Sequence, residues 1–259
     1  MATVQLSHVR AWYDERGEGD PLVLLHGGAV DARFFAPNID ALAARFHVVT
    51  PDLRGHGHTP DVEGPFTYGS LTDDAVELIE AVVGGPAHLV GHSIGAGVAL
   101  HVALRRPDLV RGLALISGAF HHHGQIAVDA IDVDQVVAAF GASYGEISPD
   151  GEDHYAVVVR KEIEMDRREP ALDPSDLAGV TARTLVMASD DDVITLEHTI
   201  ALYRGIPNAA LAVIPGTSHF LTQEKPELTT TMVADFLRTE PVATIAPLRR
   251  AGDARSCHA

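Results

Sequence analysis

Residues 87–106 read AHLVGHSIGAGVALHVALRR. The apolar run at 87–90 is typical of a buried strand, and residues 95–106 have the pattern of a helix. The pentapeptide Gly91-His92-Ser93-Ile94-Gly95 joins the two. A strand-to-helix turn this tight holds its serine in a strained backbone conformation and exposes the hydroxyl, while the two glycines let strand and helix approach without Cβ clashes. The stretch therefore predicts that Ser93 is a nucleophile.

Strands and helices alternate on both sides of this turn. Apolar runs predict strands, and apolar residues at helical spacing predict helices. Such an alternation predicts the α/β class, with a mostly parallel sheet covered by helices on both faces. The expected strands are a pair within 4–13 that turns near Ser7, then 21–25, 46–50, 87–90, 110–116, 184–188 and 211–214; the expected helices are 71–83, 95–106, 196–203 and 226–237.

One segment interrupts the alternation. Residues 118–180 show no strand–helix unit, and we expect a core domain in two parts, 1–117 and 183–240, separated by a helical lid insertion at 118–182. The tail at 241–259 has little apolar content and is expected to be flexible. Two helices are expected in the insertion, one with Val133, Val136, Val137 and Phe140 on a shared face and one with Tyr155, Val159 and Ile163.

Composition excludes several classes of function. The formal net charge is −17, without a run of basic residues, so a nucleic-acid partner is not expected. Cys257 is the one cysteine, which rules out an intrachain disulfide. Neither a signal peptide nor a stretch of ~20 apolar residues is evident, so we expect a cytoplasmic protein without a membrane partner.

Four further motifs follow predicted strands in a characteristic order. They are His26-Gly27-Gly28, DLRGHGHT at 52–59, Ser189-Asp190-Asp191-Asp192 and Gly216-Thr217-Ser218-His219. With Ser93 among them, residues 4–237 resemble the α/β-hydrolase superfamily, in its branch of small lidded serine esterases, lactonases and cofactor-free haloperoxidases. The resemblance implies an α/β-hydrolase fold with an eight-stranded sheet and a lid. Ser189 stands where the family's acid turn has glycine.

The chemistry of a serine nucleophile requires two partners. A serine hydroxyl reacts only when a base takes its proton, and a carboxylate on the far ring nitrogen orients that base. In this fold the chain order is Ser, acid, His, which fits Ser93, Asp192 and His219. Counting from Ser189 favours Asp192 as the acid, and Asp191 is the alternative. An acid after the strand at 110–116 is disfavoured, because residues 117–124 contain no carboxylate.

Position in these motifs also predicts the binding groups. The amides of Gly28 and Ile94 are expected to form the oxyanion hole. We assign His26, His92 and Phe120 to substrate binding, with His26 ordering the oxyanion loop and His92 either lining the pocket or packing in the core. No cofactor is expected, because no G-x-G-x-x-G motif is completed. No metal is expected either: residues 121–123 are three histidines, but consecutive residues rarely converge on one ion.

The sequence favours a serine hydrolase that cleaves a small carboxylic ester, lactone or thioester through an acyl-enzyme on Ser93. A cofactor-free perhydrolase or haloperoxidase would use the same residues, and a non-catalytic ligand-binding protein would be expected to lack some of them. Residues 118–180 contain thirteen acidic and four basic residues. If this segment covers the site, its field favours neutral or cationic small-molecule substrates over anionic ones; if its acids face solvent on the outer side, the substrate does not sense them.

Overall fold

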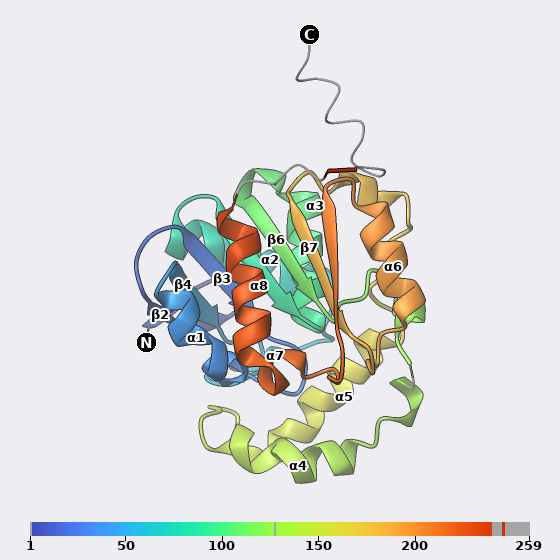
Figure 1. Cartoon of the computed structure of the whole chain (residues 1–259). Coiled ribbons are helices and arrows are strands. Elements are labelled where there is room, and N and C mark those ends of the chain that lie inside the picture. The colour runs from blue at the N-terminus through green and yellow to red at the C-terminus, as the bar shows by residue number, and fades with distance from the viewer. Residues whose placement is uncertain (1, 127, 240–244, 247–259) are drawn as a thin grey trace.

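The computed structural model describes residues 2–126, 128–239 and 245–246. Its centre is an eight-stranded sheet in the order β1-β2-β4-β3-β5-β6-β7-β8 (Figure 1). Strands β3 to β8 are parallel to one another, and the pairs β1–β2 and β2–β4 are antiparallel. The expected mostly parallel sheet is confirmed. The strands are Ala2–Gln5, Arg10–Arg16, Pro21–Leu25, His47–Pro51, Ala87–His92, Val110–Ile116, Thr184–Ser189 and Ala209–Ile214, for β1 to β8.

Helices cover both faces of this sheet because successive strand residues point to opposite sides. Val23 and Leu25 of β3 pack in one cluster with residues of α2, α3 and α6, whereas Leu22 and Leu24 pack in another with residues of α1 and α8. The helices of the core are α1 (Ala36–Ala43), α2 (Tyr68–Leu78, continued by a π-helical turn Ile79–Val83), α3 (Ile94–Arg105), α6 (Leu196–Gly205), α7 (Leu221–Glu224) and α8 (Pro226–Arg238). Helix α1 was not expected from the sequence.

The segment between β6 and β7 carries α4 (Val133–Gly145) and α5 (Tyr155–Asp166), which lie together at one end of the sheet (Figure 1). Tyr155, Val159 and Ile163 are 1%, 2% and 7% exposed, so the expected apolar face of α5 is buried. The expected face of α4 is covered only in part, since Phe140 is 38% exposed. Short 3₁₀ turns lie at Ala32–Phe35, Pro107–Leu109, His122–Gly124, Val128–Ala130, Glu152–His154 and Asp176–Gly179.

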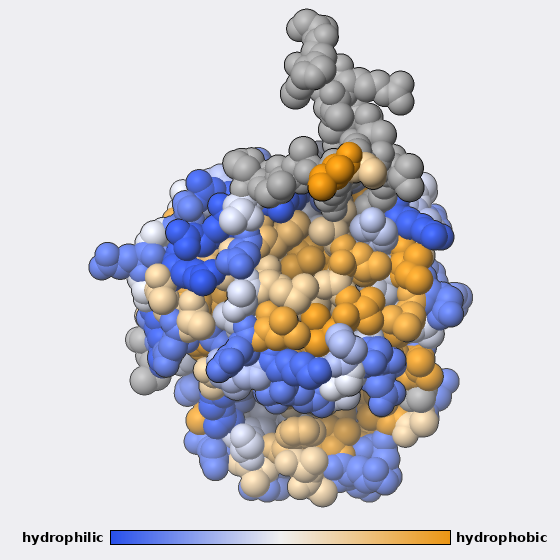
Figure 2. Space-filling view, viewed as in Figure 1, coloured by the Kyte–Doolittle hydropathy of each residue, from blue (hydrophilic) through white to orange (hydrophobic). Residues whose placement is uncertain are grey.

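The surface of the core is partly apolar along the outer edge of the sheet. Leu211 and Val213 of β8 are 37% and 41% exposed, and Figure 2 shows a hydrophobic area on this side of the core. Within the described ranges, no helix is long and apolar enough to cross a membrane. The flexible tail expected at 241–259 lies outside the described residues except for 245–246.

Candidate active site

Ser93 forms the whole turn between β5 and α3. Strand β5 ends at His92 and α3 begins at Ile94, and Ser93 has a φ of 54° and a ψ of −119°. A non-glycine residue in this region costs roughly 1–3 kcal/mol, which the surrounding structure must hold in place. A Cβ at Gly91 would lie 2.1 Å from the carbonyl oxygen of Gly95. The glycines are therefore required by the close approach of strand and helix, as the sequence predicts.

His219 and Asp192 come together from the loops after β8 and β7. The Nδ1–H of His219 donates to Asp192 Oδ1 at 2.7 Å, and the Asp192 side chain is 1% exposed. The carboxylate also accepts the Ser117 hydroxyl at 2.5 Å, the Ser189 hydroxyl at 3.0 Å and the Ile194 amide at 3.2 Å. Burial acts to raise the pKa of Asp192, but these hydrogen bonds and the charge of His219 outweigh it and hold the pKa well below its ordinary value.

The three consecutive aspartates have different surroundings. Asp192 contacts His219, Asp191 is exposed, and Asp190 accepts the amides of Gly216 and Thr217 at 2.7 and 3.3 Å. Asp190 thus holds the backbone of the loop that carries His219. The contacts of Asp190 with Gly216 and Thr217, and of Ser117 with Asp192, were not expected from the sequence. Each joins two loops that are far apart in the sequence and lie together only once the sheet has formed.

The loop after β3 lies directly against the Ser93 turn. A Cβ at Gly27 would lie 3.0 Å from Ser93 Cβ, and one at Gly28 would lie 2.8 Å from Ile94 Cδ1. The two peptide segments expected to supply the oxyanion amides are therefore neighbours. Asp52 stabilises this loop, because its Oδ1 accepts a hydrogen bond from the Ala32 amide at 2.8 Å.

His26 supports the loop instead of facing a substrate. It is fully buried; its Nδ1–H donates to the Gly27 carbonyl at 2.7 Å, and its Nε2 accepts the Leu53 amide at 3.0 Å. These two roles require the neutral ring, and burial lowers the pKa of His26 accordingly. The expected ordering role fits this placement, but direct substrate contact by His26 does not, because no side-chain surface is exposed.

His92 and Phe120 are also packed side chains. The Nε2–H of His92 donates to the His219 carbonyl at 2.8 Å, its ring stacks on Phe34, and burial lowers its pKa to about 3. Phe120 is 4% exposed and stacks on His198 with ring centroids 4.0 Å apart. This placement of His92 fits the packed alternative, and its role stays a prediction. Substrate contact by Phe120 stays a prediction.

A cavity of about 170 Å³ lies between the core and the inserted helices. Phe34 lines it and also stacks on His92, the neighbour of Ser93, but neither Ser93 nor His219 is among its lining residues. Its other walls include Ala29 and Arg33 from the core, with Phe140, Tyr144 and Tyr155 from α4 and α5. The inserted helices thus form part of a pocket whose wall includes Phe34, the residue that stacks on His92.

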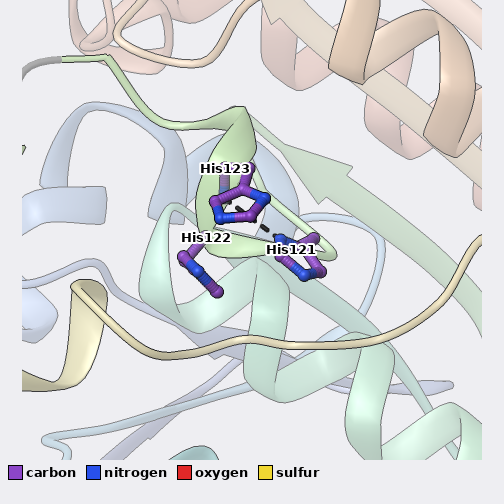
Figure 3. A group of neighbouring side chains, drawn as sticks. All are labelled: His121, His122 and His123. Carbon is purple, nitrogen blue, oxygen red and sulfur yellow. Dashed lines mark hydrogen bonds between the residues drawn. The ribbon is translucent and has the colours of Figure 1, made fainter.

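The three histidines 121–123 lie at the start of the inserted segment (Figure 3). One ring nitrogen from each lies within 4.8 Å of the others. However, His121 Nδ1 accepts the His123 amide at 3.2 Å, and the rings of His121 and His122 stack at 4.3 Å. Stacked rings do not aim their lone pairs at one centre, so the expectation that this group holds no metal is kept as a prediction.

Comparisons with known proteins show the family to which the chain belongs. Residues 22–230 match the family model described as "Alpha/beta hydrolase family". The chain is 26% identical to 2-(acetamidomethylene)succinate hydrolase of Mesorhizobium japonicum over 255 residues, covering 86% of this chain and 90% of the relative. It is 38% identical to (E)-2-((N-methylformamido)methylene)succinate hydrolase of Acinetobacter baylyi over 119 residues, which are 46% of this chain and 45% of that relative.

A solved structure confirms the expected fold. The crystal structure of the enol-lactonase from Burkholderia xenovorans LB400 superposes with a TM-score of 0.75 over 92% of this chain and 100% of that chain. The sequence identity is 22%.

Proposed function

Because the chain belongs to the alpha/beta hydrolase family and is an enzyme of the hydrolase class, we propose that it cleaves a small carboxylic ester, lactone or thioester through an acyl-enzyme on Ser93. One observation carries the proposal: the loops after β7 and β8 orient His219 through Asp192 at 2.7 Å, while the strained turn after β5, two strands from β7, presents Ser93. Cleavage needs a nucleophile, a base and an orienting acid, and these three residues supply them.

The reaction follows from the roles of these groups. His219 Nε2 takes the proton of Ser93 Oγ as that oxygen attacks the substrate carbonyl carbon. The amides of Gly28 and Ile94 donate to the oxygen that becomes negative, and His219 then returns the proton to the leaving group. A water molecule repeats the sequence on the acyl-enzyme and frees Ser93. Asp192 keeps the proton on Nδ1, which leaves Nε2 free as the base.

The pocket and the relatives narrow the substrate class. The cavity between the core and the inserted helices, about 170 Å³, suits a small acyl or leaving group, and α4 and α5 act as the lid that closes it. The two sequence relatives are named as hydrolases of succinates with an amide-bearing methylene group, so we include such compounds among the candidates. A cytoplasmic location stays part of this proposal.

A substrate panel tests the proposal. The enzyme and its Ser93→Ala variant are assayed with p-nitrophenyl esters, lactones, thioesters and amidomethylene succinates, with Ser175→Ala as the matched control at an exposed serine. We expect hydrolysis of at least one class by the enzyme and the control, and none by Ser93→Ala. Binding without turnover by the enzyme would contradict the proposal and favour a ligand-binding protein.

A further inference from the structure

Ala29 directly follows the proposed oxyanion residue Gly28, and its backbone is strained. Its φ is 59°, in the left-handed region that residues with a Cβ rarely adopt. Left to itself, such a residue relaxes to a negative φ, and this would rotate the peptide next to Gly28. Ala29 therefore stays in place only if its surroundings hold it.

Helix α5 holds both polar groups of the Ala29 backbone. The Ala29 amide donates to both carboxylate oxygens of Glu162, at 3.0 and 3.1 Å, and the Ala29 carbonyl accepts the Tyr155 hydroxyl at 2.7 Å. Glu162 also touches the neighbouring glycine closely: a Cβ at Gly28 would lie 2.8 Å from Glu162 Oε1. Two side chains of the inserted segment, Glu162 and Tyr155, thus hydrogen-bond to the backbone of Ala29, the residue after the proposed oxyanion amide.

The charge of Glu162 is balanced by His56. Glu162 is 6% exposed, and its Oε1 accepts the Nε2–H of His56 at 2.6 Å. The other ring nitrogen of His56 faces the Arg54 carbonyl at 2.9 Å, so both nitrogens donate and the ring is the imidazolium. Burial acts to lower the pKa of His56, but Glu162 outweighs it and the pKa is raised.

A buried ion pair is a poor device for attaching a helix. Removing two charges from water costs several kcal/mol, and apolar side chains of similar volume often stabilise as well or better. Helix α5 already has such contacts, since Val158 and Val159 are 0% and 2% exposed. The directed contact with Ala29 is what an apolar side chain could not supply.

We propose that Glu162 is a positioning residue, an inference that rests on the proposed function. It keeps Ala29 in the left-handed backbone conformation and thereby aims the Gly28 amide at the oxyanion. The inserted segment then does more than cover the pocket: α5 completes the oxyanion hole. An enzyme with α5 displaced would bind substrate but would stabilise the transition state poorly.

The test compares Glu162→Gln with Glu164→Gln, a control on the same helix whose side chain is 56% exposed. The amide of Glu162→Gln offers one acceptor where the carboxylate offers two and loses the charge that holds His56. We expect kcat to fall about 10- to 100-fold, as for a mispositioned oxyanion donor, with KM within about threefold. Affinity for a boronic acid inhibitor should fall with kcat. The control should match the wild type.

Rescue separates positioning from simple stabilisation. Glycine reaches positive φ without strain, so Ala29→Gly in the Glu162→Gln background should recover most of the lost kcat. Should Glu162→Gln fail to fold, Tyr155→Phe removes the other contact with Ala29 and should show the same kcat effect and the same rescue. An unchanged kcat, a loss confined to KM, or a loss that Ala29→Gly does not reduce would overturn the proposal. Labelling of wild-type Ser93 by a fluorophosphonate is measured in parallel, because its failure would count against the proposed function instead.

Discussion

Replacing Asp192 by asparagine tests how His219 is oriented. In the wild type, Oδ1 receives the His219 Nδ1–H and the Ile194 amide, while Oδ2 receives the hydroxyls of Ser117 and Ser189 and, at 3.4 Å, the Ser189 amide. An asparagine must place its NH₂ on one of these two sides. Each side has a backbone amide that can only donate, but the Ile194 amide is the closer one, at 3.2 Å against 3.4 Å for the Ser189 amide. The two hydroxyls on the Oδ2 side can turn and accept.

The NH₂ therefore belongs on the side of the serines, and the oxygen stays toward His219. The histidine then keeps its productive tautomer, and what is lost is the negative charge that stabilises the imidazolium. We set this loss at about 3 kcal/mol, the upper value for a hydrogen bond to a charged group, which corresponds to about 10²-fold in kcat. A reversed tautomer would cost about 10⁴-fold.

The assay is the kcat of Asp192→Asn on the best ester of the panel, beside Asp191→Asn as the control at an exposed aspartate. We expect a loss of about 10²-fold for the first and less than about twofold for the second. A loss near 10⁴-fold would refute the hydrogen-bond reasoning, because it would mean that the amide had turned its NH₂ to His219. Equal losses would move the acid role away from Asp192.

Three further predictions follow from the same structure. A crystal structure with a phosphonate on Ser93 should place the phosphonyl oxygen within hydrogen-bonding distance of the amides of Gly28 and Ile94; an oxygen that points elsewhere contradicts the oxyanion assignment. Of two matched esters, one with a quaternary ammonium and one with a carboxylate, the first should have the higher kcat/KM at low salt, because residues 118–180 contain thirteen acidic and four basic residues. A higher kcat/KM for the carboxylate ester, which would match the succinates named for the relatives, would contradict this prediction. Burial and the charge of Glu162 raise the pKa of Asp166 from 3.8 to about 7. Between these pH values the folded state keeps a proton that the unfolded state has lost, so the stability of the wild type falls as pH rises. The Tm of Asp166→Asn relative to the wild type should therefore rise by several degrees between pH 4 and 8, and a constant difference in Tm across this range would contradict the assigned pKa.

The parts of the fold predicted from the sequence are those that local patterns determine. The strand expected at 110–116 is β6 with the same bounds, because an apolar run between turn residues defines it. The strained turn at Ser93 could be predicted because it needs glycines at fixed positions. Helix α1, at 36–43, was missed, although its proline at the first turn is a common helix start.

The missed site residues share a different cause. Glu162 reaches Ala29 across 133 positions of the chain, and Asp190 reaches Gly216 across 26. No local pattern marks such a pair, because each residue alone looks like an ordinary surface acid. His26 and Phe120 show a related limit: their place in the chain was informative, but the direction of their side chains depends on packing by distant segments.

The most direct test of the central claim is the site of the acyl group during turnover. The enzyme is mixed with a p-nitrophenyl ester, quenched in acid within milliseconds, and mapped by mass spectrometry of its peptides. We expect the mass of the acyl group on Ser93, and in Ser93→Ala neither that adduct nor more than a trace of turnover. An acyl group on another residue, or a Ser93→Ala variant that keeps more than a few per cent of the activity, would contradict the account.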